Sequence, residues 1–597
     1  MQKNTMILKS LPVLLLFATV SVVQAQGIRE EGEHAIRLNQ IGFYPQAPKT
    51  AVMEGDFSGA FHVTSADGQD TLYSGTIEKA RSKGYGSRHI SRADFSSLTE
   101  PGIYRLQVSG LGRSHPFEIS KGVHEAVAKA ALKGFYFQRA STGLPKQYAG
   151  KWHRRGGHPD DRVLVHPSAA SPGRPAGTVI EASRGWYDAG DYNKYIVNSG
   201  ITMGTLLSFF EDYPEFAAGI RLNVPESSNE LPDLLDEILW NLRWMITMQD
   251  PGDGGVYHKM TSAGFSAMVM PEEDTATRYV VQKSTAASLN FAAVMAQSAR
   301  IFTAYSKQLP GLADSCLSAA EKAWEWAQVY PEMIYDQNEL NRQFDPDITT
   351  GAYGGRTLSD EYIWAAAELY VSTGNEQYLQ VINGNIPDDE PLSVPSWSHV
   401  KALGYYTLLR FGDVMADGEI REQQAIRHSV LALADTLVER ASQNPFKTVM
   451  GYDPGHFVWG SNSVAANQGM LLLQAYRQKP KQEYIDYALA NLDYLLGRNG
   501  TGYSFVTGYG SRTPMFPHHR PSVADGVDEP VPGLLAGGPN PGQQDECEYP
   551  SDLPDQSYTD AVCSYASNEI AINWNAPLVY LSGALEALQY EAGYSGQ

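Results

Sequence analysis

The chain has 597 residues, and its 46 Lys and Arg residues against 67 Asp and Glu residues give a formal net charge of −21. At 43% hydrophobic and 19% charged, the composition is that of a chain able to bury large cores, so disorder is excluded as its main character. Nucleic acid and anionic membrane surfaces are disfavoured as partners, because their recognition needs clustered Lys and Arg. A neutral or cationic ligand fits better, and the length exceeds that of one ordinary domain.

The first 25 residues predict a secretory signal peptide. Lys3 and Lys9 precede an uncharged apolar run from Leu11 to Val23, and Val23-Gln24-Ala25 is a small-x-small cleavage pattern. A membrane anchor is the alternative, but about 13 apolar residues are too few to span roughly 30 Å of hydrocarbon. We therefore expect a secreted or periplasmic protein with no membrane anchor.

Residues 34–120 predict a small β-sandwich. The run Tyr104–Val108 alternates apolar and polar residues, which is the period of a strand. Turn residues at Asp67-Gly68 and Glu100-Pro101-Gly102 separate similar runs. Several short strands of this kind within a hundred residues are typical of a β-sandwich that forms a module of its own.

From residue 121 to the end, the period of the apolar residues becomes helical, which predicts a second domain over residues 121–597. Leu231, Leu234, Ile238 and Leu242, for example, recur at helical spacing. A dozen helices with long loops favour a closed helical toroid over a simple bundle. We expect them near residues 121–140, 195–212, 229–249, 281–306, 311–329, 357–373, 375–382, 397–411, 419–442, 463–477, 481–497 and 570–592.

Three cysteines are too few for a disulfide framework, so stability must come from packing. Cys547 and Cys563 lie 16 residues apart in a stretch rich in Gly and Pro, and a bond between them would stiffen that loop. Two buried thiols are the alternative.

Two stretches carry carboxylates in settings suited to chemistry. In Gly185–Tyr195, Asp188 and Asp191 stand three residues apart among Gly and aromatic residues just ahead of a helix, where they could hold and deprotonate a water or bind a metal. Glu569 stands at a loop-to-helix junction among aromatic residues, an environment that raises a carboxyl pKa and suits proton donation. The alternative in both places is an acidic first turn of a helix.

A third stretch, Pro517-His518-His519-Arg520, places polar donors in a loop rich in Gly and Pro. Adjacent histidines are weak evidence for a metal site, because paired ligands usually stand at helical or strand spacing.

Together these stretches resemble glycoside hydrolase family 9, the β-1,4-glucanases. Asp188–Tyr195 resembles the catalytic-base motif of that family, Phe516–Arg520 its substrate-binding histidine motif, and Asn568–Pro577 its catalytic-acid motif, in the same order along the chain. Arg37–Phe43 is similar to the start of the immunoglobulin-like module that precedes the catalytic domain in one subgroup. The resemblance implies a mainly α fold, an (α/α)₆ barrel preceded by a small immunoglobulin-like β-sandwich.

The resemblance also implies residue roles. Asp191 would be the general base, Asp188 would help to position the attacking water, and Glu569 would be the general acid of an inverting mechanism, which needs one acid and one base on opposite sides of the sugar. The implied substrate-binding residues are His258, His519 and Arg520 for sugar hydroxyls, Tyr565 beside the reacting bond, and Trp459 as a stacking face.

Metal expectations follow from the same resemblance. Some members with this N-terminal module carry a zinc site of Cys and His, but the stretch from Trp152 to His166 has no Cys, so zinc is not expected. Asp360 and Glu361 resemble part of a structural calcium site, and the alternative is an ordinary helix start with an acidic first turn.

We therefore predict a secreted, cellulase-like endo-β-1,4-glucanase that cleaves cellulose or related β-glucans with inversion and acts as a monomer. One alternative is a related hydrolase acting on xyloglucan, mixed-linkage glucan, cello-oligosaccharide ends or amino-sugar oligomers. Another is a carbohydrate-binding protein that has lost catalysis, although the presence of all three carboxylates, Asp188, Asp191 and Glu569, speaks against it.

Overall fold

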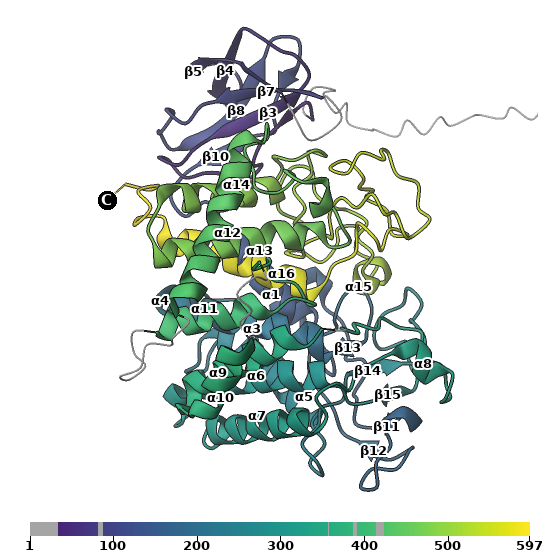
Figure 1. Cartoon of the computed structure of the whole chain (residues 1–597). Coiled ribbons are helices and arrows are strands. Elements are labelled where there is room, and N and C mark those ends of the chain that lie inside the picture. Colours follow the sequence, from purple (N-terminus) through teal and green to yellow (C-terminus); the bar gives the residue numbers. More distant parts are fainter. Residues whose placement is uncertain (1–33, 82–87, 356, 386–390, 413–422, 597) are drawn as a thin grey trace, which may run out of the picture.

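The computed structural model describes residues 34–81, 88–355, 357–385, 391–412 and 423–596 (Figure 1). The predicted signal peptide, residues 1–25, lies outside the described residues. Among the described residues, none of the helices is both long and apolar enough to cross a membrane.

The N-terminal part is a sandwich of two sheets, which lies at one end of the helical part (Figure 1). One sheet has the strand order β1-β3-β7-β6, and the other has the order β2-β10-β8-β4-β5 with β9 paired to β8. The strands are β1 (Ile36–Arg37), β2 (Gly42–Phe43), β3 (Thr50–Glu54), β4 (Ala60–Ser65), β5 (Thr71–Thr76), β6 (Glu78–Arg81), β7 (His89–Asp94), β8 (Gly102–Val108), β9 (Gly112–Arg113) and β10 (Phe117–Ile119).

The apolar core of the sandwich lies between these sheets and includes Phe43, Phe61, Leu106 and Phe117. Along β8 the burial alternates over Tyr104–Val108 as the sequence predicts, because Tyr104, Leu106 and Val108 face the core and the polar residues between them do not.

Polar contacts join the sandwich to the helical part. Asn39 donates to the buried carboxylate of Asp493 at 2.8 Å, and the Tyr44 hydroxyl donates to Glu586 at 2.9 Å. The backbone N–H of Gln40 donates to the carbonyl oxygen of Leu496 at 3.0 Å. The two parts therefore share a specific interface within one chain.

The helical part is built from paired helices, close to the predicted ranges. The helices are α1 (Glu125–Phe137), α2 (Lys146–Ala149), α3 (Ile196–Asp212), α4 (Pro214–Gly219), α5 (Asp233–Thr247), α6 (Thr285–Phe302), α7 (Leu312–Val329), α8 (Gln337–Asn341), α9 (Ser359–Thr373), α10 (Glu376–Asn385), α11 (Lys401–Phe411), α12 (Gln423–Gln443), α13 (Ser461–Gln478), α14 (Gln482–Leu495), α15 (Arg520–Ala524) and α16 (Ile572–Leu588).

Helices α13, α16, α3, α6, α9 and α11 contact one another in this order, and α12, which contacts both α11 and α13, completes the circuit. Contacts join α3 to α6, α6 to α9, α9 to α11, α13 to α16, and α16 back to α3, while α7, α10, α14 and α1 pack outside α6, α9, α13 and α16. The close approach of α3 to α9 requires glycine at position 204 of α3, because a Cβ on Gly204 would lie 2.5 Å from the ring of Trp364 in α9. The predicted fold class, an (α/α)₆ barrel preceded by an immunoglobulin-like sandwich, is confirmed.

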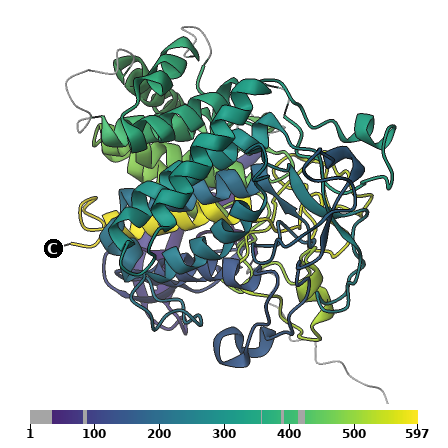
Figure 2. The same cartoon turned by 90° about the horizontal axis from the view of Figure 1, so that it is seen from below.

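A third, small sheet lies among the long loops, which gather on one side of the helices in both views (Figures 1 and 2). Its strands, in the order β12-β11-β15-β14-β13, are β11 (Val163–Val165), β12 (Val179–Ile180), β13 (Lys194–Tyr195), β14 (Lys259–Ser262) and β15 (Arg278–Val280). The elements predicted for residues 121–597 are helices separated by long loops, and they include no strand of this sheet. Strands of two to four residues, paired across long sequence separations, leave no local period in the sequence.

Cys547 and Cys563 form a disulfide, which resolves the two alternatives for this pair. The third cysteine, Cys316, is buried in α7 and free.

Candidate active site

Asp188 is held in the loop that leads into β13 and α3. Its carboxylate accepts hydrogen bonds from Asn198 Nδ2 at 2.6 Å and from the Tyr353 hydroxyl at 3.0 Å. Only 1% of its surface is exposed. Burial and the nearby charge of Asp191 raise the pKa of Asp188 to about 8, although the two hydrogen bonds oppose this shift.

Asp191 is oriented by Asn193, whose side-chain amide donates to Asp191 Oδ2. The amide oxygen of Asn193 accepts in turn from the Thr261 hydroxyl at 2.9 Å and from the backbone N–H of Ser262 at 3.0 Å. Both of these residues lie in β14, so the small sheet fixes the direction in which Asp191 points.

Glu569 comes from a loop more than 370 residues further along the chain, and backbone contacts bring it to the two aspartates. The Asp188 carbonyl accepts from the backbone N–H of Ile572 at 2.8 Å, and Ala189 forms an isolated bridge with Ala571. His518 forms a second bridge, parallel, with Glu569 itself. Three loops distant in sequence therefore meet at the N-terminal end of α16.

Gly190 allows this close approach. An ideal Cβ at Gly190 would lie 1.9 Å from the carbonyl oxygen of His518 and 3.3 Å from Glu569 Oε1. Any larger residue would push the loop of the two aspartates away from the loop of Glu569.

The environment of Glu569 favours its protonated form. Burial and the charge of Asp191 raise the pKa of Glu569 well above its ordinary value, and the positive charge of Arg520 only partly opposes them. Part of the surface of the residue is still exposed. The site thus holds a neutral carboxyl that can give a proton beside a carboxylate that can take one.

His519 and His258 are buried, and both ring nitrogens of each bond to the protein itself, so their expected contact with sugar hydroxyls stays a prediction. His519 is 1% exposed, and its ring nitrogens bond to Gln138 at 3.0 Å and to Ser522 at 2.8 Å. His258, also 1% exposed, bonds to Ser284 and to the carbonyl of Ala352, each at 2.8 Å.

The physical reason is the same for His519 and His258. A buried imidazole stays neutral and must satisfy both ring nitrogens inside the protein, and burial lowers the pKa of each to about 3. Both histidines therefore hold loops together.

Arg520 is also buried and acts on the backbone. Its guanidinium donates to the carbonyl of Gly190 at 2.8 Å and, through two nitrogens, to the carbonyl of Ser266 at 2.9 and 2.8 Å. It thus fixes the aspartate loop and places a positive charge near Glu569, which differs from the expected direct contact with sugar hydroxyls.

Trp459, Tyr565 and His518 form a partly exposed aromatic surface beside Glu569, here called the aromatic wall. Trp459 is 45% exposed, and its ring centroid lies 5.4 Å from that of Tyr565. His518 packs edge-on against Tyr565 at 5.9 Å. Partly exposed aromatic faces suit the apolar faces of sugar rings, so Trp459 and Tyr565 remain candidates for substrate contact.

Two residues at the site were not singled out as candidates by the sequence analysis. Within the His-His pair, His518 is the histidine that belongs to the aromatic wall, and an adjacent pair gives no signal of which ring turns outward. Tyr353, with a positive φ of 47°, reaches Asp188 from a loop 165 residues away. Neither feature has a local sequence signature.

Asp360 and Glu361 lie in the first turn of α9 with their carboxyls close together. Asp360 accepts from the backbone N–H of Val400 at 2.8 Å, and one oxygen of Glu361 is buried without a hydrogen-bond partner. Burial and Asp360 raise the pKa of Glu361 well above its ordinary value. Among the described residues no group of three or more His, Cys, Asp or Glu side chains could hold a metal, so a cation here would need backbone or water oxygens as well.

Comparison with known proteins gives matches over nearly the whole chain. The model of glycosyl hydrolase family 9 matches residues 124–582, and the model of the cellulase N-terminal Ig-like domain matches residues 31–113. A xyloglucan-specific endo-β-1,4-glucanase of Bacteroides ovatus is 47% identical over 93% of this chain and 94% of that protein. Endoglucanase D of Acetivibrio thermocellus is 34% identical over 91% of this chain and 82% of that protein.

Solved structures agree with these sequence matches. The structure titled Bacteroides ovatus GH9 superposes with a TM-score of 0.88 at 45% identity, and it covers 93% of this chain and 99% of that one.

Proposed function

Because this chain belongs to glycosyl hydrolase family 9, an inverting family of glycoside hydrolases, we propose that it hydrolyses β-1,4-glucans at the site formed by Asp188, Asp191 and Glu569. The observation that carries the proposal is the meeting of these three carboxyls, from two separate loops, with the pKa of Glu569 raised well above its ordinary value. Glu569 is the general acid, and Asp191 is the general base.

The reaction proceeds in one displacement without a covalent intermediate. Glu569 gives its proton to the glycosidic oxygen as the bond to the anomeric carbon breaks. Asp191 takes a proton from a water that attacks the opposite face of the sugar, and Asp188 helps to orient that water. The hydrogen bonds of Asn193 and Asn198 hold the two aspartates in the geometry that this step requires.

Xyloglucan is the proposed preferred substrate, since the similar Bacteroides ovatus enzyme is named for it. The partly exposed aromatic wall offers stacking faces for a glucan backbone. The test is the product profile of the purified enzyme on xyloglucan, mixed-linkage glucan, soluble cellulose derivatives and chito-oligosaccharides.

Each substrate is also given to Asp191→Asn as a control. Activity confined to chito-oligosaccharides would contradict the substrate class. Equal activity of the wild type and the variant would contradict the site.

A calcium ion held by Asp360 and Glu361 is a second proposal, supported by the unpartnered buried oxygen of Glu361 beside another carboxyl. Carboxylate oxygens are the ligands that calcium prefers, and its charge would stabilise two acids at close range. The ion would tie the start of α9 to the loop of Val400. Elemental analysis of the purified protein tests it.

We also propose that the chain is exported as a monomer after cleavage before Gln26. The apolar run and the small-x-small pattern ahead of this residue support the proposal. Mass spectrometry of the mature N-terminus tests the cleavage site, and light scattering tests the monomeric state.

A further inference from the structure

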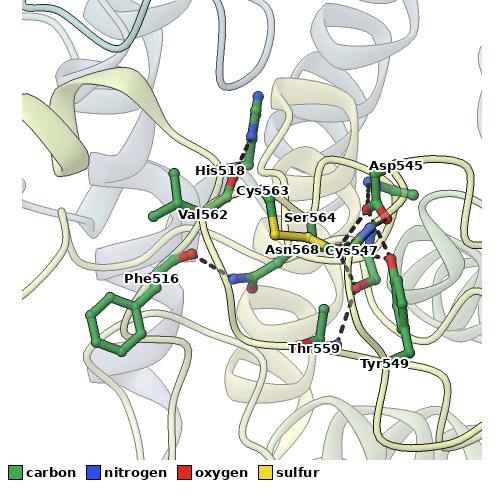
Figure 3. Close-up of a disulfide and its surroundings, with 12 residues drawn as sticks. Phe516, His518, Asp545, Cys547, Tyr549, Thr559, Val562, Cys563, Ser564 and Asn568 are labelled. Carbon is green, nitrogen blue, oxygen red and sulfur yellow. Dashed lines mark hydrogen bonds between the residues drawn. A yellow bond between two sulfur atoms is a disulfide. The ribbon is translucent and has the colours of Figure 1, made fainter.

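Residues 544–549, here called the strap, run beside the loop that carries Glu569 (Figure 3). Two kinds of bond join the strap to that loop. One is the disulfide between Cys547 and Cys563, and the other is a set of hydrogen bonds to the carboxylate of Asp545.

The Asp545 carboxylate, 9% exposed, accepts four hydrogen bonds. Its Oδ2 accepts from the Tyr549 hydroxyl at 2.8 Å, from the Ser564 hydroxyl at 2.8 Å and from the backbone N–H of Ala566 at 2.9 Å. Its Oδ1 accepts from the backbone N–H of Cys547 at 3.2 Å. These bonds outweigh burial and keep the pKa of Asp545 below its ordinary value, so the group stays charged.

The strap reaches the aromatic wall through residues next to its two links. The Tyr565 hydroxyl donates to the carbonyl of Gln544 at 2.7 Å, and the backbone N–H of Tyr565 donates to the carbonyl of Cys563 at 3.0 Å. His518 Nδ1 bonds to the carbonyl of Val562, the neighbour of Cys563, at 2.6 Å. The outward-facing rings of His518 and Tyr565 are therefore anchored at the disulfide and the strap.

The same links lead to the backbone of Glu569. Ala566, bonded to Asp545, stands three residues before Glu569. The backbone N–H of Asn568 donates to the carbonyl of Ser564 at 3.0 Å, and the carbonyl of Asn568 accepts from the backbone N–H of His518 at 2.9 Å. The turn from which Glu569 extends is thus fixed from the strap side.

Apolar packing contributes little to holding the strap. Most of its residues are exposed or only partly buried, and Glu548 and Tyr549 line a cavity of about 1250 Å³ between the sandwich and the loops. The disulfide and Asp545 are therefore the main restraints on its position.

We propose that Asp545 and the Cys547–Cys563 disulfide are positioning groups for Glu569, which hold the proton donor at the distance and angle that glycosidic cleavage requires. The inference rests on the proposed role of Glu569 as general acid. Misplacement of a reacting group by about 1 Å costs up to roughly 100-fold in rate. The loss should fall on the step that needs the proton.

The first test uses Asp545→Ala and compares two substrates. One is xyloglucan, whose sugar leaving group needs protonation, and the other is a dinitrophenyl β-cello-oligosaccharide, whose phenolate leaves without it. We expect kcat/KM to fall about 10- to 100-fold on xyloglucan and about tenfold less on the activated substrate. A general loss of folded enzyme would instead lower the activity on both substrates by the same factor.

Asp435→Asn is the matched control for Asp545. Asp435 also accepts from a tyrosine hydroxyl, that of Tyr484 at 2.8 Å, but it lies on α12 and takes no part in the strap. We expect the ratio of activities on the two substrates to stay at the wild-type value in this variant.

The second test breaks the disulfide alone. The only other cysteine, Cys316, is buried and free, so dithiothreitol acts on this single bond, and Cys563 is exposed to it. We expect the reduced wild type and the double variant Cys547→Ser, Cys563→Ser to show the same substrate-dependent loss as Asp545→Ala. The double variant should not respond to dithiothreitol.

The outcomes separate this inference from the proposed function. If Glu569→Gln shows the leaving-group dependence while the strap variants and the reduced enzyme do not, the positioning role is overturned and the general acid stands. If Glu569→Gln does not show it, the general acid assignment itself fails. If Asp545→Ala does not fold, the activities of the double variant and of the reduced wild type on the two substrates decide whether the positioning role stands.

Discussion

Tyr353→Phe removes one of the two side-chain hydrogen bonds to Asp188 and leaves the ring in place. The hydroxyl donates to Asp188 at 3.0 Å, while the ring packs edge-on against Tyr195 at 4.8 Å and Trp397 at 5.2 Å. The substitution therefore opens no large cavity. A hydrogen bond to a charged group contributes about 1.5–3 kcal/mol, so kcat/KM should fall roughly 10- to 100-fold.

The Tyr353→Phe variant should also change the pH dependence of kcat/KM, in a direction set by the pKa of Asp188. Burial and the charge of Asp191 raise the pKa of Asp188 to about 8, and the bonds from Asn198 and Tyr353 lower it. Without the Tyr353 hydroxyl only the bond from Asn198 remains, so the pKa of Asp188 should rise further. A step that uses ionised Asp188 then loses rate at a higher pH, and the acid limb of kcat/KM should move upward.

The assay is the pH profile of kcat/KM on a soluble β-glucan for the wild type, Tyr353→Phe and Tyr484→Phe. Tyr484 is the matched control, because its hydroxyl also donates to a carboxylate, that of Asp435 at 2.8 Å, and this bond joins α14 to α12 and does not involve the three carboxyls of the site. An acid limb that stays in place or moves to lower pH in Tyr353→Phe would refute the reasoning, as would an equal shift in Tyr484→Phe.

Three further predictions concern the acid, the stereochemistry and the metal. Glu569→Gln should lower turnover on β-glucan by roughly 10²- to 10⁴-fold. The pKa of Glu569 is raised in the folded state, so its stabilising contribution is present at low pH and is lost as the pH rises. The melting temperature of Glu569→Gln relative to the wild type should therefore increase with pH. A difference in melting temperature that stays constant with pH would contradict this expectation. NMR of the first product from a β-glucan should show the α-anomer, as inversion with Asp191 as base requires, and initial release of the β-anomer would exclude it. Chelation should lower the melting temperature more than the activity if calcium binds Asp360 and Glu361; no change, with no calcium by elemental analysis, would remove the ion.

The sequence alone predicted the parts of the molecule that depend on local pattern. Alternating residues such as those of β8 and the helical spacing in α5 follow from the periods of strand and helix, so the sandwich, the helix ranges and the fold class could be predicted. Asp188, Asp191 and Glu569 stood out because carboxylates among Gly and aromatic residues form short, recognisable motifs. The motifs also led to the family.

Tertiary structure decided everything that depends on a partner remote in sequence. It turned His518 outward and His519 inward to Gln138, and it brought Tyr353 to Asp188. It also paired Cys547 with Cys563 and formed the small sheet that orients Asp191. A residue's type and neighbours fix its local conformation, but the atom that satisfies its buried polar group comes from a segment that only folding brings near.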